Sequence, residues 1–122
     1  MRSIVTAAEL EAVLREPLAL LYKHSDSCPI STMSLHELAR LDAAHDDVPL
    51  FVIDVHAQRP LARYVAERLG VRHESPQIVL LRAGEPLWHA SHYGVNARAI
   101  ERALAEAEAG AEAGAGEMRE AG

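Results

Sequence analysis

The feature that most constrains the fold is the alternation of short apolar runs with stretches of helical spacing. Four runs have the length and composition of β-strands, and they span residues 18–22, 50–55, 78–81 and 87–91. Between the first three runs lie stretches whose apolar residues recur every three or four positions and which open on Pro29 and Pro60. Two strands joined through a helix form a parallel pair with a right-handed crossover.

A further helix is expected at each end of the chain. Thr6 and Glu9 have the spacing of a capping box, and Asn96 is a suitable N-cap for a closing helix. Residues 83–85 predict a turn, so the last two runs form a hairpin. The order αβαβαββα predicts an α/β fold in which a mixed four-stranded sheet is flanked by helices on both faces, the thioredoxin-like arrangement.

The middle of this pattern also gives expectations for side chains. In the helix that opens at Pro29 we expect Ile30, Met33, Leu38 and Leu41 to share the buried face. Residues 23–27, which follow the first strand, are polar and predict a turn.

Length and composition exclude several classes of protein. The chain has 122 residues, enough for one domain, and its 49% apolar residues exclude wholesale disorder. No apolar run approaches the ~20 residues of a membrane span, and the first 14 residues lack a signal-peptide core. A single cysteine excludes an intramolecular disulfide framework. We therefore expect a soluble, cytoplasmic protein in a reducing compartment.

The charge is concentrated at the C-terminal end. Of the formal charge of −6, residues 105–122 carry five Glu and one Arg, so the rest of the chain is nearly neutral. No basic stripe is present, which argues against nucleic acid as a partner, and nothing predicts a membrane partner. We expect residues 1–104 to form the thioredoxin-like domain and residues 105–122, rich in Ala, Glu and Gly, to form a frayed helix or a disordered tail.

The one cysteine, Cys28, stands between the first strand and the helix that begins at Pro29. As the N-cap it would face the free N–H groups of Ile30 and Ser31 and the positive end of the helix dipole. That environment favours the thiolate, which is the form that attacks a disulfide. The alternative is an inert, packed side chain. The polar residues 24–27 argue against burial.

Ser31 occupies the position at which a dithiol redox protein carries its second cysteine. A serine can cap the helix or donate a hydrogen bond to the thiolate, but it cannot form a disulfide. If Cys28 is reactive, the protein must therefore use one thiol and obtain the second from solution or from a partner.

A second candidate group lies in residues 71–77, directly before the third strand. In this topology that loop faces the helix that follows Cys28. A cis Ser75–Pro76 bond would expose the backbone of Ser75 to pair with an extended thiol ligand. Arg72 and His73 could offer positive charge to an anionic ligand, or they could be solvated loop residues.

Residues 24–31, 70–77 and 88–92, together with residues 52–55 and the following Arg59 and Pro60, resemble the YtxJ-type monothiol bacilliredoxins of the bacillithiol system. The similarity covers about residues 3–104. It implies a thioredoxin fold, Cys28 as the redox thiol and Pro76 as the cis-proline. It also implies bacillithiol, a glucosamine–malate–cysteine thiol, as co-substrate, with no tightly bound cofactor. Ser27 is smaller than the residue that often precedes the cysteine in that family.

The resemblance implies a reaction in which the Cys28 thiolate removes bacillithiol from bacillithiolated client proteins and carries it as a mixed disulfide. The side chains around Cys28 that would support this reaction are Ser27, Pro29, Ile30 and Ser31. The malate carboxylates of bacillithiol would give Arg72, His73, Lys23 or Arg59 something to bind.

Other readings differ in class. A cluster-binding monothiol glutaredoxin would have Gly-Phe where Pro29 and Ile30 stand, and its Gly-Gly-x-Asp loop is missing. The seven His residues show no reliable metal-ligand spacing, so no metal site is expected. The remaining alternative is a non-catalytic thioredoxin-like module that binds a protein partner and keeps Cys28 for packing.

Overall fold

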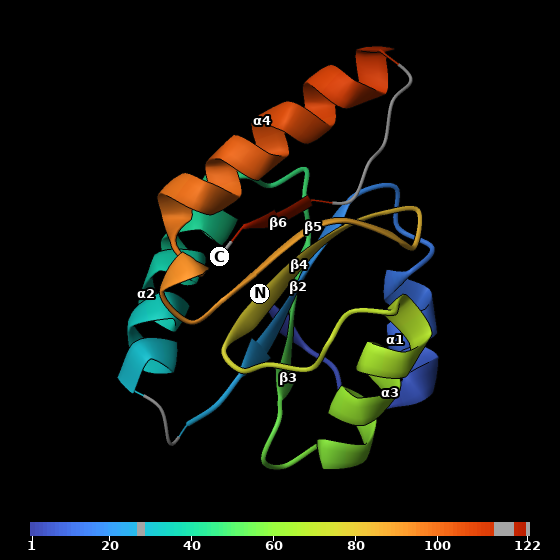
Figure 1. The fold of residues 1–122 in the computed structure, drawn as a ribbon, viewed down its shortest axis with the longest axis vertical. Helices are drawn as coiled ribbons and strands as arrows, with labels where there is room; N and C mark the ends of the chain where they lie inside the picture. The colour runs from blue at the N-terminus through green and yellow to red at the C-terminus, as the bar shows by residue number, and fades with distance from the viewer. Residues whose placement is uncertain (27–28, 114–118, 122) are drawn as a thin grey trace.

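A computed structural model of the chain describes residues 1–26, 29–113 and 119–121 (Figure 1). Along the chain the elements are β1 (Arg2–Ser3), α1 (Ala7–Val13), β2 (Ala19–His24), α2 (Pro29–Ala44), β3 (Leu50–Asp54), α3 (Arg59–Leu69), β4 (Gln77–Arg82), β5 (Glu85–Ser91), the 3-10 helix η1 (His92–Gly94), α4 (Ala97–Ala113) and β6 (Arg119–Ala121).

These strands form one mixed sheet in the order β1-β3-β2-β4-β5-β6. Strands β2 and β3 are parallel, and β4 runs antiparallel to both β2 and β5. The predicted α/β fold and its four central strands are confirmed. The predicted strand count is wrong, because the described residues add β1 beside β3 and β6 beside β5. Those two strands have two and three residues, too few to show a period in the sequence.

Helices cover both faces of the sheet (Figure 1). Alternate residues of β2 divide between two cores: Leu20 and Tyr22 pack in the cluster that includes α2 and α4 residues, and Leu21 packs in the cluster that includes α1 and α3 residues. The central strands are therefore buried on both sides. Their C-terminal and N-terminal ends, rather than their faces, are where a site can reach solvent.

Local sequence signals set several element boundaries. The Thr6 side chain accepts a hydrogen bond from the Glu9 amide, and the Thr6 amide donates one to Oε1 of Glu9, so the capping box is present. Pro60 lies in the first turn of α3. The Oδ1 of Asn96 accepts a hydrogen bond from the Ala99 amide at 2.9 Å, as expected for the N-cap of α4.

The prediction of a turn over residues 23–27 is wrong at its start. Strand β2 continues through His24, and all six of its residues are buried. The ammonium of Lys23 is accommodated because its Nζ donates to Oε1 of Gln77, the residue opposite it on β4, at 2.8 Å. Ser25 is buried as well. The expectation that polar flanks mean exposure therefore fails for these residues.

The predicted buried face of α2 needs a similar correction. Leu38 and Leu41 are buried as expected, but Met33 is 64% exposed. The inward positions one and two turns before Leu38 are held by Ser31 and Ser34. Serine is tolerated there because both hydroxyls have partners, and that of Ser34 donates to the Val95 carbonyl at 3.1 Å.

At the C-terminal end, α4 crosses residue 104 and runs to Ala113. Ala107 packs in the core cluster, and the Arg82 guanidinium donates to its carbonyl. The division of the chain at residue 104 and the disorder of the tail stay predictions. Within the described ranges, none of the helices combines the length and apolar character needed to span a bilayer.

Candidate functional site

Cys28 and Ser27 lie outside the described residues, and so does the predicted N-cap geometry of the thiol. The residues on either side are described. Strand β2 ends at His24, and α2 begins at Pro29, which is exposed, followed by the half-buried Ile30. The cysteine therefore immediately precedes the first residue of α2 in the chain, as the sequence predicted.

The two sides of this segment are joined by a buried polar network centred on Ser31. Its Oγ accepts a hydrogen bond from the Ser25 amide at 2.9 Å and lies 2.9 Å from both Nδ1 of His24 and the Tyr22 hydroxyl. The Tyr22 hydroxyl also donates to the Ser31 carbonyl at 3.1 Å. On its other side, Nε2 of His24 lies 2.7 Å from Oδ1 of Asp26.

One assignment of protons satisfies these contacts. A carboxylate accepts, so Nε2 of His24 carries the proton that faces Asp26. In the neutral imidazole Nδ1 is then an acceptor, and the Ser31 hydroxyl donates to it. The Ser31 side chain is fully buried. It thus ties the end of β2 to the first turn of α2 from the inside.

The loop before β4 lies beside this segment. The Ser75–Pro76 peptide bond is cis, as the resemblance implied. Pro76 is buried, and its carbonyl accepts from the His92 amide at 2.9 Å. Because Lys23 pairs with Gln77 in antiparallel register, the next positions along the two strands are His24 and Pro76. The fold therefore brings the cis-proline next to the end of β2 that leads to Cys28.

Two further contacts hold this loop. The side-chain amide of Gln77 donates to the Arg72 carbonyl at 2.9 Å, and the Ser91 hydroxyl donates to Oε2 of Glu74 at 2.6 Å. The bond from Ser91 lowers the pKa of Glu74, with smaller contributions from nearby basic groups. The loop is thus fixed to both β4 and β5.

Lys23 is the only lysine of the chain and is fully buried. Burial lowers its pKa from 10.5 to about 8, against an opposing effect of Glu74. This burial is not predictable from the sequence, because a lysine after an apolar run is usually at a strand end. The burial depends on Gln77, which lies opposite Lys23 on β4, and this pairing is seen only in the strand register.

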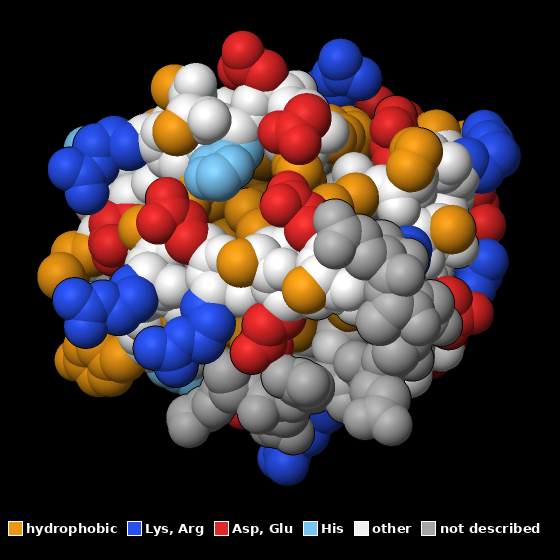
Figure 2. All heavy atoms as spheres, turned by 90° about the horizontal axis from the view of Figure 1, so that it is seen from above, with side chains coloured by type: hydrophobic (Ala, Val, Ile, Leu, Met, Phe, Trp, Pro, Cys, Tyr) orange, Lys and Arg blue, Asp and Glu red, His pale blue; other side chains and the backbone are white. Residues whose placement is uncertain are grey.

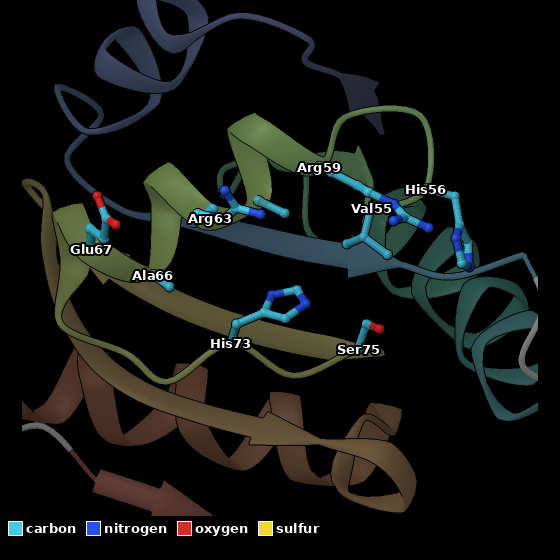
Figure 3. A pocket seen from close by; sticks show the side chains of 9 residues that line it. Val55, His56, Arg59, Arg63, Ala66, Glu67, His73 and Ser75 are labelled. Atoms are coloured by element: carbon cyan, nitrogen blue, oxygen red, sulfur yellow. The ribbon is translucent and has the colours of Figure 1, made fainter.

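A pocket of about 410 Å³ opens between α3 and the loop before β4 (Figure 3). Its wall on α3 includes Arg59 and Arg63, and its opposite wall includes His73 and Ser75. Val55 and His56, which follow β3, also line it. The Val55 amide donates to the His24 carbonyl at 3.0 Å, so the pocket adjoins the end of β2.

The structure separates the predicted binding residues. His73 and Ser75 line the pocket, whereas Arg72 is exposed outside it. Partial loss of surrounding water lowers the pKa of His73, and the charge of Lys23 lowers it further, against the effect of Glu74. Sequence analysis missed His56 and Arg63. Arg63 could have been found, since it lies one helical turn after Arg59.

The described part of the chain holds no group of three or more His, Cys, Asp or Glu side chains that could bind a metal ion. Trp88 packs in the core cluster rather than in the pocket. The described residues at the end of β2 and the start of α2 therefore adjoin a cis-proline loop, a buried polar network and a pocket bordered by arginines.

Comparison with solved structures places this fold. A candidate oxidoreductase with a thioredoxin fold is 28% identical over 84% of this chain and 91% of that chain, with a TM-score of 0.77. Thioredoxins from Trypanosoma brucei brucei (10% identical, covering 88% of this chain and 89% of that one, TM-score 0.74) and Fasciola hepatica (18%, 87% and 98%, TM-score 0.72) share the fold.

A family model described as monothiol bacilliredoxin BrxC matches residues 2–100, which is most of the chain. The match includes the cysteine, the cis-proline loop and α3. Together with the thioredoxin fold, it supports a thiol redox function. The chain belongs to the monothiol bacilliredoxin BrxC family.

Proposed function

We propose that this protein is a monothiol thiol–disulfide oxidoreductase that removes bacillithiol from S-bacillithiolated client proteins. The observation that carries the proposal is that Cys28, the sole cysteine, directly precedes α2 in the sequence, and that the cis-proline loop lies beside the end of β2 that leads to it. The position three residues later holds Ser31, whose hydroxyl belongs to a buried network. Since Cys28 is the sole cysteine, no second thiol in the chain can resolve a mixed disulfide internally.

In the first step the Cys28 thiolate attacks the bacillithiol sulfur of the client's mixed disulfide. The bond between Cys28 and bacillithiol forms while the bond between the client and bacillithiol breaks, and the client cysteine leaves as a thiolate that takes up a proton. The client is reduced and Cys28 is oxidised. The helix N-terminus stabilises the Cys28 thiolate that starts the reaction.

In the second step a free bacillithiol thiolate attacks the bacillithiol sulfur held on Cys28. The Cys28 thiolate leaves, and bacillithiol disulfide is released. Over both steps the client's cysteine sulfur gains one electron and the incoming bacillithiol sulfur loses one, while the sulfur of the transferred bacillithiol stays at the disulfide level, so the protein returns unchanged. Bacillithiol is a co-substrate in this scheme, and no tightly bound cofactor takes part.

The remaining residues have supporting roles in the proposal. The backbone of Ser75, before Pro76, pairs with the cysteinyl part of the bound thiol. His73, which lines the pocket, offers a donor to its anionic groups, whereas Arg72 lies outside the pocket. Ser27, Pro29, Ile30 and Ser31 shape the start of α2 around the sulfur. A reaction of this kind belongs in the reducing cytoplasm, where bacillithiol is kept largely as the free thiol.

The test is a de-bacillithiolation assay. A client protein carrying a single bacillithiol mixed disulfide is incubated with the protein and free bacillithiol, and the client's mass is followed over time. We expect loss of the bacillithiol mass from the client with the wild type and none above background with Cys28→Ser. Equal activity of the Cys28→Ser variant would show that the mechanism is wrong.

A further inference from the structure

The pocket between α3 and the cis-proline loop carries an inference about how the co-substrate is held. Ser75 lines the pocket at one side, and it is the residue bonded to Pro76. His56 lines it as well, and its Nε2 lies 3.1 Å from Oγ of Ser25, three residues before Cys28. A ligand whose sulfur reaches Cys28 and whose chain follows Ser75 would therefore extend into this pocket.

The charge of the pocket selects the chemistry of that ligand. Arg59 and Arg63 lie one helical turn apart on α3 (Figure 3). Among the described residues neither guanidinium has an ion pair or a hydrogen bond, whereas Arg68 on the same helix pairs with Glu11. The one carboxylate of the lining, Glu67, lies at the end of the pocket away from Ser75 (Figure 3). Two guanidinium groups along one wall of the pocket, neither of them ion-paired among the described residues, suit a ligand with two carboxylates.

The surroundings add donors and positive potential. Lys23 is fully buried near His73, and only one of the three N–H groups of its ammonium has an acceptor in the described chain, Gln77. Helix α3 begins at Arg59, so its positive end lies at the pocket wall. His73 faces the pocket and can donate one N–H as a neutral imidazole (Figure 3).

The volume limits the ligand to a small molecule. About 410 Å³ lies within the range of small-ligand sites, roughly 300–1,000 Å³, and is too small for a folded segment of a client protein. On the face drawn in Figure 2, charged side chains of both signs are intermixed, whereas the α3 wall of this pocket carries two arginines.

We propose that this pocket binds the malate dicarboxylate of bacillithiol, with Arg59 and Arg63 as its main ligands, while the cysteinyl end follows Ser75 toward Cys28. The proposal rests on bacillithiol being the co-substrate. It makes α3 the element that distinguishes bacillithiol from thiols that lack two carboxylates at this distance from the sulfur.

The experiment compares two disulfides: oxidised bacillithiol, and the disulfide of cysteinyl-glucosamine, which lacks malate. The second-order rate of mixed-disulfide formation on Cys28 is measured by mass spectrometry for the wild type, Arg59→Gln, Arg63→Gln and the control Arg98→Gln. Arg98 is an exposed arginine on α4. We expect each pocket variant to lose about tenfold in rate with oxidised bacillithiol, the effect of one charge-assisted hydrogen bond. The rate with the malate-free disulfide should be unchanged.

The proposal is overturned if Arg59→Gln and Arg63→Gln behave like Arg98→Gln, or if they slow both disulfides equally. A binding measurement separates this from failure of the proposed function. The Cys28→Ser protein is titrated with S-methyl bacillithiol while the imidazole NMR signals of His56 and His73 are followed. If the ligand shifts these signals and the shifts are lost with Arg59→Gln and Arg63→Gln, but wild-type Cys28 does not react, the pocket is supported and the proposed function is contradicted. If wild-type Cys28 reacts but the arginine substitutions change neither the shifts nor the rate, the proposed function is supported and the pocket is contradicted.

Discussion

The Oγ of Ser31 lies 2.9 Å from Nδ1 of His24, and both side chains are buried. This contact joins the last residue of β2 to the first turn of α2, on either side of the cysteine position. Ser31, at the position where dithiol proteins have a second thiol, thus has a structural role in this chain. Its hydroxyl also accepts from the Ser25 amide.

Replacing Ser31 with alanine should therefore destabilise the protein. The Ser25 amide and Nδ1 of His24 would each lose a hydrogen bond to the Ser31 hydroxyl in a site closed to water, which costs about 1–3 kcal/mol. Urea unfolding followed by circular dichroism measures the change. Ser34→Ala is the matched control, because the Ser34 hydroxyl is equally buried but has one partner, the Val95 carbonyl.

We expect Ser31→Ala to lose more stability than Ser34→Ala, without a change in the slope of the urea dependence. If the two variants were equal, or if Ser31→Ala were as stable as the wild type, the network would not be holding the start of α2.

The buried ammonium of Lys23 predicts a pH dependence of stability. Its pKa is about 8 in the folded protein against 10.5 when exposed, so the unfolded chain binds more protons between these values. Stability therefore rises with pH across that window, by roughly 3 kcal/mol for this one group, and the cost is fully present below pH 8.

The measurement is the difference in unfolding free energy between the wild type and Lys23→Met at a series of pH values. The upward slope between pH 8 and 10.5 should be present in the wild type and missing in the variant. Because Lys23 is the only lysine, its side-chain NMR signal reports the pKa directly. A midpoint near 10.5 would show that the ammonium is hydrated.

Much of the fold follows from local signals in the sequence. Thr6 and Asn96 cap the helices that they were expected to cap, and Pro29 and Pro60 lie in the first turns of α2 and α3. These signals work because a helix end must satisfy its own backbone groups within a few residues. Such constraints can be read without knowing the tertiary structure.

The misplaced predictions depend on contacts between distant segments. Ser31 is buried because its hydroxyl has hydrogen-bond partners in Tyr22 and His24, and Lys23 is buried because Gln77 faces it from another strand. Met33 is exposed because the serines occupy the inner face of α2. Hydrophobic periodicity assigns polar residues to the outside, so it fails where polar side chains pair with each other in the interior.

The same limit applies to the candidate site. Cys28, Ser75 and Pro76 could be singled out from the sequence, because each belongs to a short motif. The pocket could not, since it combines residues of α3 with His73 and Ser75 of a separate loop. The sequence does not distinguish Arg63, which lines that pocket, from Arg72, which lies outside it.

Two glycines allow a matched test of backbone conformation. Both have positive φ, 67° at Gly70 and 83° at Gly84. A Cβ at Gly70 meets nothing within 4 Å, whereas one at Gly84 lies 3.0 Å from the Leu14 carbonyl oxygen. Alanine at Gly70 should cost about 1–2 kcal/mol from the left-handed backbone alone.

Alanine at Gly84 should cost more, because the Leu14 backbone must also move. Thermal unfolding of the two variants gives the order. A Gly84→Ala protein as stable as Gly70→Ala would mean that the β4–β5 turn does not approach the end of α1 as closely as the structure shows.

The reactivity of Cys28 distinguishes a redox thiol from a packed one. The start of α2 at Pro29 predicts a thiolate stabilised by the helix N-terminus. The rate of alkylation by iodoacetamide, measured against pH, should therefore have a midpoint well below the ~8.5 of free cysteine. A midpoint at or above that value would favour a non-catalytic binding module.

The central claim is that Cys28 exchanges with bacillithiol and keeps it as a mixed disulfide. The most direct measurement is the intact mass of the protein after exposure to oxidised bacillithiol and, separately, to oxidised glutathione. We predict one bacillithiol adduct, located on Cys28, missing in Cys28→Ser and formed faster than the glutathione adduct. An unmodified protein after exposure to oxidised bacillithiol, or equal rates with both disulfides, would contradict the account.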